Sequence, residues 1–251
     1  MNAVPVLFYE AVCSSRLGMN PISECRELSG RFGRVAADVF NNAAYHFVGL
    51  RNGQFCDFGY LSHFNVLSRN VVKLKKVSRK HHLYTSIFVS ADGGEYSTDP
   101  AALEKLSAAT KGKRVVLSFE TSNLSKELEN WIGTIQFCFS LNVAADVSIP
   151  DSLIQKKTLI QLEYKGNTLI SDEATNQLLQ LLKQDQFHGA TIPGISEENL
   201  QKLIDEWREN ASEMAGKHVL CKEQLTLDEE LGFRKCTEEE ERHFDVICPG
   251  F

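Results

Sequence analysis

This chain of 251 residues lacks the features that mark a membrane or secreted protein. No apolar run approaches the roughly 18 residues that a membrane-spanning helix needs. The first twelve residues contain no lysine or arginine, with which a secretory signal would begin. We therefore expect a cytoplasmic or nuclear protein that makes no contact with a membrane.

Closely spaced cysteines are also missing. The seven cysteines are never closer than 12 positions, so the sequence has no CxxC pair and no zinc-ligand spacing. An odd number of dispersed cysteines is typical of a reducing compartment, where a buried thiol serves as a small apolar side chain. We expect most or all seven to be free thiols.

An excess of positive charge is absent as well. The net charge of −6 argues against a nucleic-acid partner. The densest basic stretch runs from Arg69 to His82, with apolar residues interleaved. It could form a groove for phosphates or for an acidic partner. The net charge favours the alternative, an amphipathic element with a solvated basic face.

No motif for catalysis, cofactor binding or metal binding is evident. The segment Lys111–Arg114 has a single glycine, too few for a phosphate-binding loop, and Gly194–Ser196 lacks the spacing of a hydrolase nucleophile. His81 and His82 are adjacent, so on a strand they would point to opposite faces. We therefore predict no cofactor and no metal, and expect that the protein is not an enzyme.

The pattern of residues divides the chain into four segments. Residues 1–43 have helical periodicity, with Pro5 suited to a first helical turn. The apolar positions proposed for one side of these helices are Phe8, Val12, Cys25, Leu28, Phe32, Val35, Val39 and Phe40. Residues 44–98 are β-rich: alternation on both sides of Asn52-Gly53 predicts a hairpin, and Leu83–Ser90 predicts another strand.

Residues 99–222 repeat a strand–helix pattern. Strand-like runs centre near Leu117, Phe139, Gln161, Thr191 and Val219. Helix starts are indicated at Asp99-Pro100, Ser125, Asp172 and Ser196. Apolar residues follow at helical spacing, and Trp131 and Trp207 should be substantially buried.

The predicted fold class is α/β, with stacked strand–helix repeats that resemble leucine-rich repeats in arrangement although not in consensus. A single sheet of wound topology is the alternative. Residues 223–251 form an acidic tail in which two capping-box patterns, Thr226–Glu229 and Thr237–Glu240, predict short helices.

Two stretches resemble a family. Both are similar to a nematode-expanded group of F-box-like proteins. The first is the opening Val4–Cys13 with Cys25–Gly33. The second is Leu178–Phe187, followed by Trp207–Asn210 and Gly216–His218. The resemblance implies that residues 1–43 dock on the Skp-type adaptor of a cullin-type ubiquitin ligase. The residues it assigns to the partner contact are Pro5, Phe8, Val12, Leu28 and Phe32.

The sequence therefore favours a protein–protein interaction module, with the substrate-recognition subunit of a ubiquitin ligase as the specific form. The same residues 1–43 could instead form an end cap of the repeat stack. The rival class is an enzyme or small-molecule binder with a site at the carboxyl ends of parallel strands. The sequence leaves the oligomeric state open.

Overall fold

The computed structural model describes residues 25, 27–42, 44–62, 73–74, 82–90, 98–120 and 124–221. The chain divides into two compact units. Unit 1 comprises Met1–Phe47, Phe58–Thr85 and Lys235–Phe251, and unit 2 comprises Val48–Asp57 and Ser86–Arg234. The predicted tail, residues 223–251, lies outside the described residues, and the segment boundaries at 43, 98 and 222 stay predictions.

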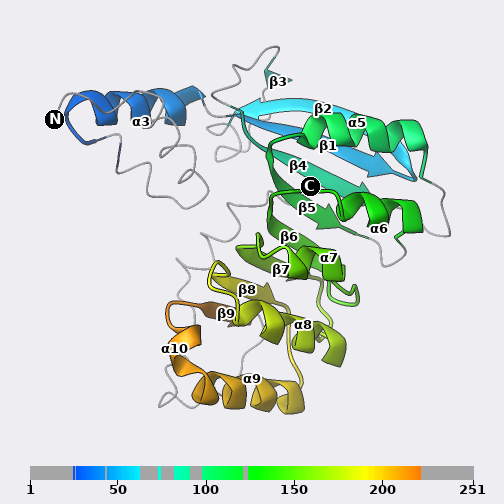
Figure 1. Ribbon diagram of the computed structural model, residues 1–251, viewed down its shortest axis with the longest axis vertical. Helices are drawn as coiled ribbons and strands as arrows, with labels where there is room; N and C mark the ends of the chain where they lie inside the picture. The colour runs from blue at the N-terminus through cyan, green and yellow to red at the C-terminus, as the bar shows by residue number, and fades with distance from the viewer. Residues whose placement is uncertain are drawn as a thin grey trace. The chain divides into compact units, whose positions relative to one another are not determined.

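The fold is mixed α/β, as the sequence predicts. The strands of the described residues are β1 (Ala44–Arg51), β2 (Gln54–Ser62), β3 (Lys73–Leu74), β4 (His82–Ser90), β5 (Arg114–Phe119), β6 (Cys138–Ala144), β7 (Gln161–Lys165), β8 (Gly189–Ile192) and β9 (His218–Cys221). The helices are α3 (Gly30–Asn42), α5 (Pro100–Thr110), α6 (Lys126–Ile132), α7 (Asp151–Gln155), α8 (Asp172–Leu182), α9 (Glu197–Glu209) and α10 (Ala211–Met214). Hydrogen bonding joins the strands in the order β3-β2-β1-β4-β5-β6-β7-β8-β9 (Figure 1).

The predicted hairpin is confirmed. Strands β1 and β2 are neighbours joined by the two-residue turn Asn52-Gly53. Both turn residues have positive φ, 50° at Asn52 and 78° at Gly53. A turn of this kind matches the twist of the flanking strands and favours asparagine and glycine.

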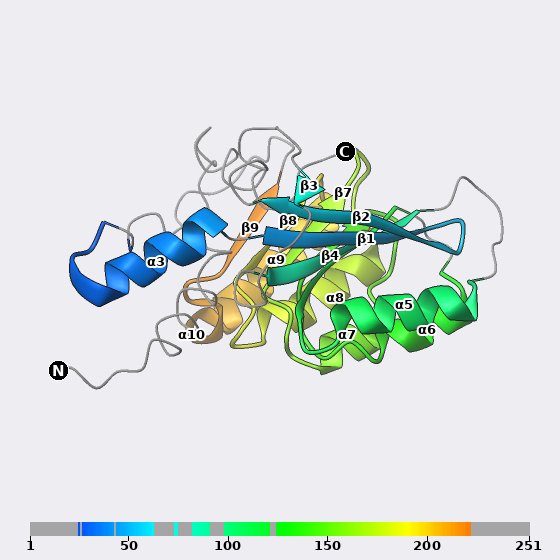
Figure 2. The same cartoon turned by 90° about the horizontal axis from the view of Figure 1, so that it is seen from above.

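The repeated strand–helix pattern forms a stack in unit 2. Strands β5 to β9 are parallel and pair in consecutive order. Because each step moves to the next strand in the same direction, right-handed crossovers put all connecting helices on one face. Figure 2 shows the helices of unit 2 together on one side of these strands. A wound sheet reverses its strand order at a switch point. No reversal occurs along β5–β9, so these strands have the predicted stacked arrangement rather than the wound alternative.

The helix starts follow the predicted caps. Asp99, Ser125 and Ser196 each accept a hydrogen bond from a backbone N–H of the first helical turn, and Pro100 is the first residue of α5. Helix α8 begins at Asp172 as predicted, with Ser171 as its cap. Such caps satisfy backbone donors that have no partner within the helix.

The predicted helix faces pack into the core of unit 2. The buried members are Leu128, Trp131, Ile132, Ile135, Leu178, Leu181, Leu182 and Leu203. Trp131 is 6% exposed, whereas Trp207 is only partly buried at the edge of the core. The prediction is therefore confirmed for Trp131 and only in part for Trp207. Helix α7 has no counterpart among the predictions, because five residues are too short to show a period.

Side chains from one repeat also bond the backbone of the preceding repeat. Two lysines donate to carbonyl groups at the ends of helical segments, where carbonyls lack helical partners. The pairs are Lys156 with Gly133 and Ile135, and Lys217 with Leu182 and Gln184. In the same direction along the stack, Gln177 of α8 bonds both the N–H and the carbonyl of Ile149, at 2.8 and 3.0 Å.

In unit 1, helix α3 packs on strand residues through one face. Ala36, Val39 and Tyr45 form a small buried cluster. The partly buried residues that pack against it are Cys25, Phe32, Val35, Phe47 and Tyr84. The ring of Tyr45 stacks on that of Tyr84, with centroids 4.2 Å apart.

Candidate interaction surfaces

The structure places two of the five predicted contact residues. Leu28 is 56% exposed, whereas Phe32 packs against the small cluster of unit 1. Pro5, Phe8 and Val12 lie outside the described residues. The periodicity puts Leu28 on the same side as Cys25 and Phe32, and this is wrong. Leu28 lies in a turn before α3, where helical spacing does not apply.

Gly33 explains how this turn closes on the helix. A Cβ atom at Gly33 would overlap the carbonyl oxygen of Leu28. The backbone of the turn therefore lies directly against the first turns of α3, and only glycine leaves room for it. No sequence pattern singled out Gly33, because its role depends on a close approach that composition does not reveal.

A row of polar side chains crosses the strands on the face turned away from the helices of unit 2. Register aligns Ser118, Asn142, Glu163 and Thr191 on neighbouring strands, and we call this set the polar row. The Asn142 side-chain amide donates to the Ser118 hydroxyl at 3.0 Å. Asn142 is only 2% exposed, and Ser118 and Thr191 are also buried. Three members of the polar row therefore belong to the packed interior, whereas Glu163 is partly exposed.

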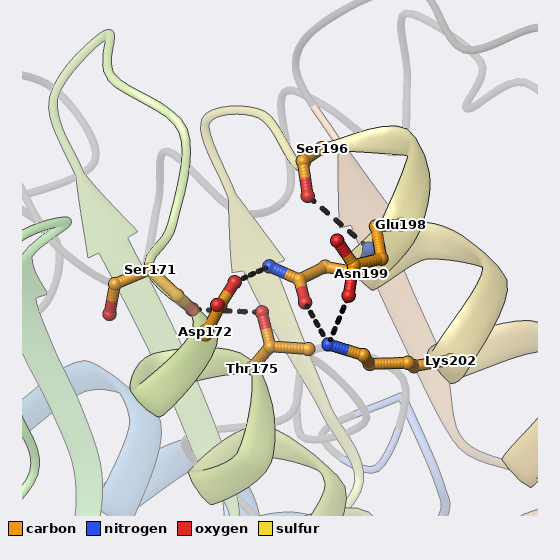
Figure 3. Close-up of polar contacts among 7 residues, drawn as sticks. All are labelled: Ser171, Asp172, Thr175, Ser196, Glu198, Asn199 and Lys202. Carbon is orange, nitrogen blue, oxygen red and sulfur yellow. Dashed lines mark hydrogen bonds and ion pairs between the residues drawn. The ribbon is translucent and has the colours of Figure 1, made fainter.

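The carboxyl ends of the strands carry a second polar group, drawn in Figure 3. The side-chain amide of Asn199, a residue 1% exposed, donates to the Asp172 carboxylate at 2.8 Å. Lys202 donates to the Asn199 side-chain oxygen at 3.3 Å and pairs with Glu198 at 3.1 Å. The amino end of α8 is thereby tied to that of α9. We call these four residues the α8–α9 network.

The chemistry of the α8–α9 network is structural. Its amide and ammonium groups bond one another, and Ser171 and Ser196 are used as helix caps. A similar hydrogen bond joins Thr98, just before α5, to Ser125, the cap of α6. Their hydroxyl oxygens are 2.8 Å apart. In the part of the chain that the structure describes, no three His, Cys, Asp or Glu residues gather as metal ligands. The rival expectation of an enzyme at this edge stays a prediction.

The buried titratable groups are held in their neutral forms. Burial raises the pKa of the Cys138 thiol to about 12, although the nearby Lys156 ammonium lowers it in part. Burial, with the Glu173 carboxylate, raises the pKa of Tyr164. The thiolate is the nucleophilic form of cysteine. Cys138 is therefore an inert core residue. Cys25 and Cys56 are also free thiols.

The predicted basic stretch is described only at Lys73, Leu74 and His82. Lys73 and Leu74 form β3, which pairs antiparallel with β2, and His82 begins β4. The choice between a groove for acidic ligands and a solvated basic face stays open.

Sequence reasoning missed the residues that join the repeats, among them Lys156, Gln177, Asn199 and Lys217. Each makes a hydrogen bond to a group that is 21 to 35 positions away in the sequence. Asn199 makes local bonds as well. Periodicity reports neighbours within a helix or strand, so it has no signal for such pairs.

Comparisons of the chain with protein-family models, with curated proteins and with solved structures find no match. No helix within the described residues is long and apolar enough to cross a membrane.

Proposed function

We propose that the protein is a protein–protein interaction module of the cytoplasm or nucleus that serves as a substrate-recognition subunit of a cullin-type ubiquitin ligase. Residues 1–43 contact a Skp-type adaptor, and the repeat stack of unit 2 contacts the substrate. Support comes from the F-box-like resemblance of the amino-terminal stretches and from the surface position of Leu28.

The exposure of Leu28 is the observation that supports the adaptor contact most directly. It is a large aliphatic side chain, more than half exposed, in the segment that the resemblance assigns to the partner. Burying such a side chain in a partner contributes about 1.5–3 kcal/mol. Apolar anchors of this kind dominate the energy of many interfaces. Phe32 is already packed within unit 1, so Leu28 is the anchor available among the two that are described.

The repeat stack supports the substrate contact through its exposed loops. The loop between β7 and α8 carries Leu169, which is 49% exposed, and the approach to β6 carries the exposed Phe137. Because β6 and β7 are parallel, Phe137 precedes its strand at one edge of the sheet and Leu169 follows its strand at the opposite edge. Repeat proteins use the extended surfaces of such stacks to bind partners.

Capture of the adaptor by the intact chain tests the proposal. Leu28→Asp puts a charge into the contact and should abolish co-purification of a purified Skp-type adaptor. Because Leu28 is exposed, the thermal midpoint should stay nearly unchanged. Leu169→Asp is the matched control, since it charges a similarly exposed leucine of unit 2 and should leave adaptor capture intact.

Three outcomes contradict the adaptor contact. The unaltered chain fails to bind the adaptor, or Leu28→Asp binds it as well as the unaltered chain does, or Leu169→Asp weakens capture equally. Phe32→Asp is expected to lower stability as well as capture, because it buries a charge in the cluster with Tyr45. Comparison of Phe32→Asp with Leu28→Asp therefore separates loss of folding from loss of the adaptor contact.

A further inference from the structure

Helix α3 is poorly matched to its own backbone dipole. It has no acidic residue in its first turn and no basic residue in its last. Arg31 instead lies in the first turn, where its charge opposes the helix dipole at a cost of about 0.3–1 kcal/mol. Gly33 lowers the helix propensity further, because a glycine inside a helix costs about 1 kcal/mol of intrinsic propensity relative to alanine.

The long helices at the carboxyl end of the stack have the opposite design. Helices α8 and α9 are capped by Ser171 and Ser196, and both have two acidic residues in the first turn. Helix α9 also has Arg208 in its last turn. The first turns of these helices carry charges that favour the helix dipole, whereas the first turn of α3 carries a charge that opposes it. At its carboxyl end, α3 has a local bond from the Asn42 side-chain amide to the Asp38 carbonyl at 2.9 Å.

The described packing of α3 is with residues of unit 1. Its buried face contacts Tyr45, Phe47 and Tyr84. None of the described residues of α3 belongs to the core cluster of unit 2. Loss of this packing would expose the face that includes Ala36 and Val39.

We propose that α3 detaches and re-docks as a separate cooperative element while the β5–β9 stack stays folded. In the docked state the apolar face of α3 is occupied by strand residues of unit 1, and in the detached state the same face is exposed to solvent. The detachment follows from the chain alone and holds whether or not an adaptor binds. Local openings of this kind are common where a segment has little stabilisation of its own.

Hydrogen exchange of the intact chain, followed by mass spectrometry at increasing low concentrations of urea, tests the proposal. Peptides that cover 30–42 should exchange at least about tenfold faster than peptides that cover 138–144 and 161–165. Their opening should also depend little on urea, because a local opening exposes little surface. The same opening rate and urea dependence in all three regions would show that α3 opens only with the whole fold, and would overturn the proposal.

A charge reversal at the amino end of α3 gives a second test. Arg31 is exposed, so Arg31→Glu corrects the dipole without changing the packed face. The protection of 30–42 should rise about two- to fivefold, with that of 138–144 unchanged. Arg208→Glu makes the same change of net charge in α9 and should leave the protection of 30–42 as it was. No rise with Arg31→Glu, or an equal rise across the chain, contradicts the separate opening of α3.

Discussion

The bond between Gln177 and Ile149 allows the coupling of neighbouring repeats to be measured. Gln177 is buried on α8, and its side-chain amide bonds both backbone groups of Ile149, which precedes α7. Gln177→Met keeps the length of the side chain and removes both bonds. It leaves a buried N–H and a buried carbonyl without these partners, because Ile149 is itself buried.

The expected cost follows from those two groups. A buried polar group that loses its partner costs about 1–3 kcal/mol, which gives about 2–6 kcal/mol for the pair. We expect the lower half of that range, because an apolar side chain replaces a buried amide and water can reach part of the gap. Since a domain is stable by only about 5–15 kcal/mol, the loss should be plain in equilibrium denaturation.

Urea denaturation, monitored by tryptophan fluorescence and by circular dichroism, measures the change. The transition midpoint of Gln177→Met should fall while the slope with urea stays constant. Asn176→Met is the matched control, because Asn176 is the exposed neighbour on α8 and should change stability by less than about 0.5 kcal/mol. A loss for Gln177→Met no larger than that of the control would refute the coupling.

Three further substitutions test the packing of unit 2. Trp131→Ala removes a buried indole whose N–H donates to Ser107 at 2.9 Å, and should cost about 3–5 kcal/mol in urea denaturation. Gly189→Ala puts a Cβ atom against the backbone carbonyl and the ring of His218, so its thermal midpoint should fall, and an unchanged midpoint would contradict the β8–β9 register. Because the pKa of Cys138 is raised to about 12 from an unfolded value of about 8.5, the unfolded chain loses this proton first, and stability should fall as pH rises through that window. Denaturation series at about pH 9 and 10 should show a shallower decline in Cys138→Ala, and an equal decline in both chains would contradict the neutral buried thiol.

Local patterns predicted the fold well because its elements obey local rules. Asn52-Gly53 turns a hairpin through positive φ, and Ser125 and Ser196 cap the helices that they precede. The wound alternative could not be excluded from the sequence, because strand order depends on pairing between distant segments. Leu28 was placed on the wrong side because a helical period was continued across a turn.

The candidate contact was less predictable for a physical reason. An apolar helix face looks the same in sequence whether it packs inside the fold or against a partner. Phe32 and Leu28 are both apolar and four positions apart, yet only the structure separates the packed residue from the exposed one. The roles of Gly33 and Lys217 are equally invisible, because they rest on backbone groups brought close by folding.

The lysines that reach back along the stack have a consequence for how unit 2 folds. Lys217 comes after α9, but the carbonyls it binds end α8, so completing one repeat finishes the helix of the repeat before it. Lys156 does the same for the end of α6. Stability in such an array resides in the junctions between nearest neighbours rather than in each repeat alone. Folding should therefore proceed along the stack repeat by repeat, with each added repeat stabilising the one before it.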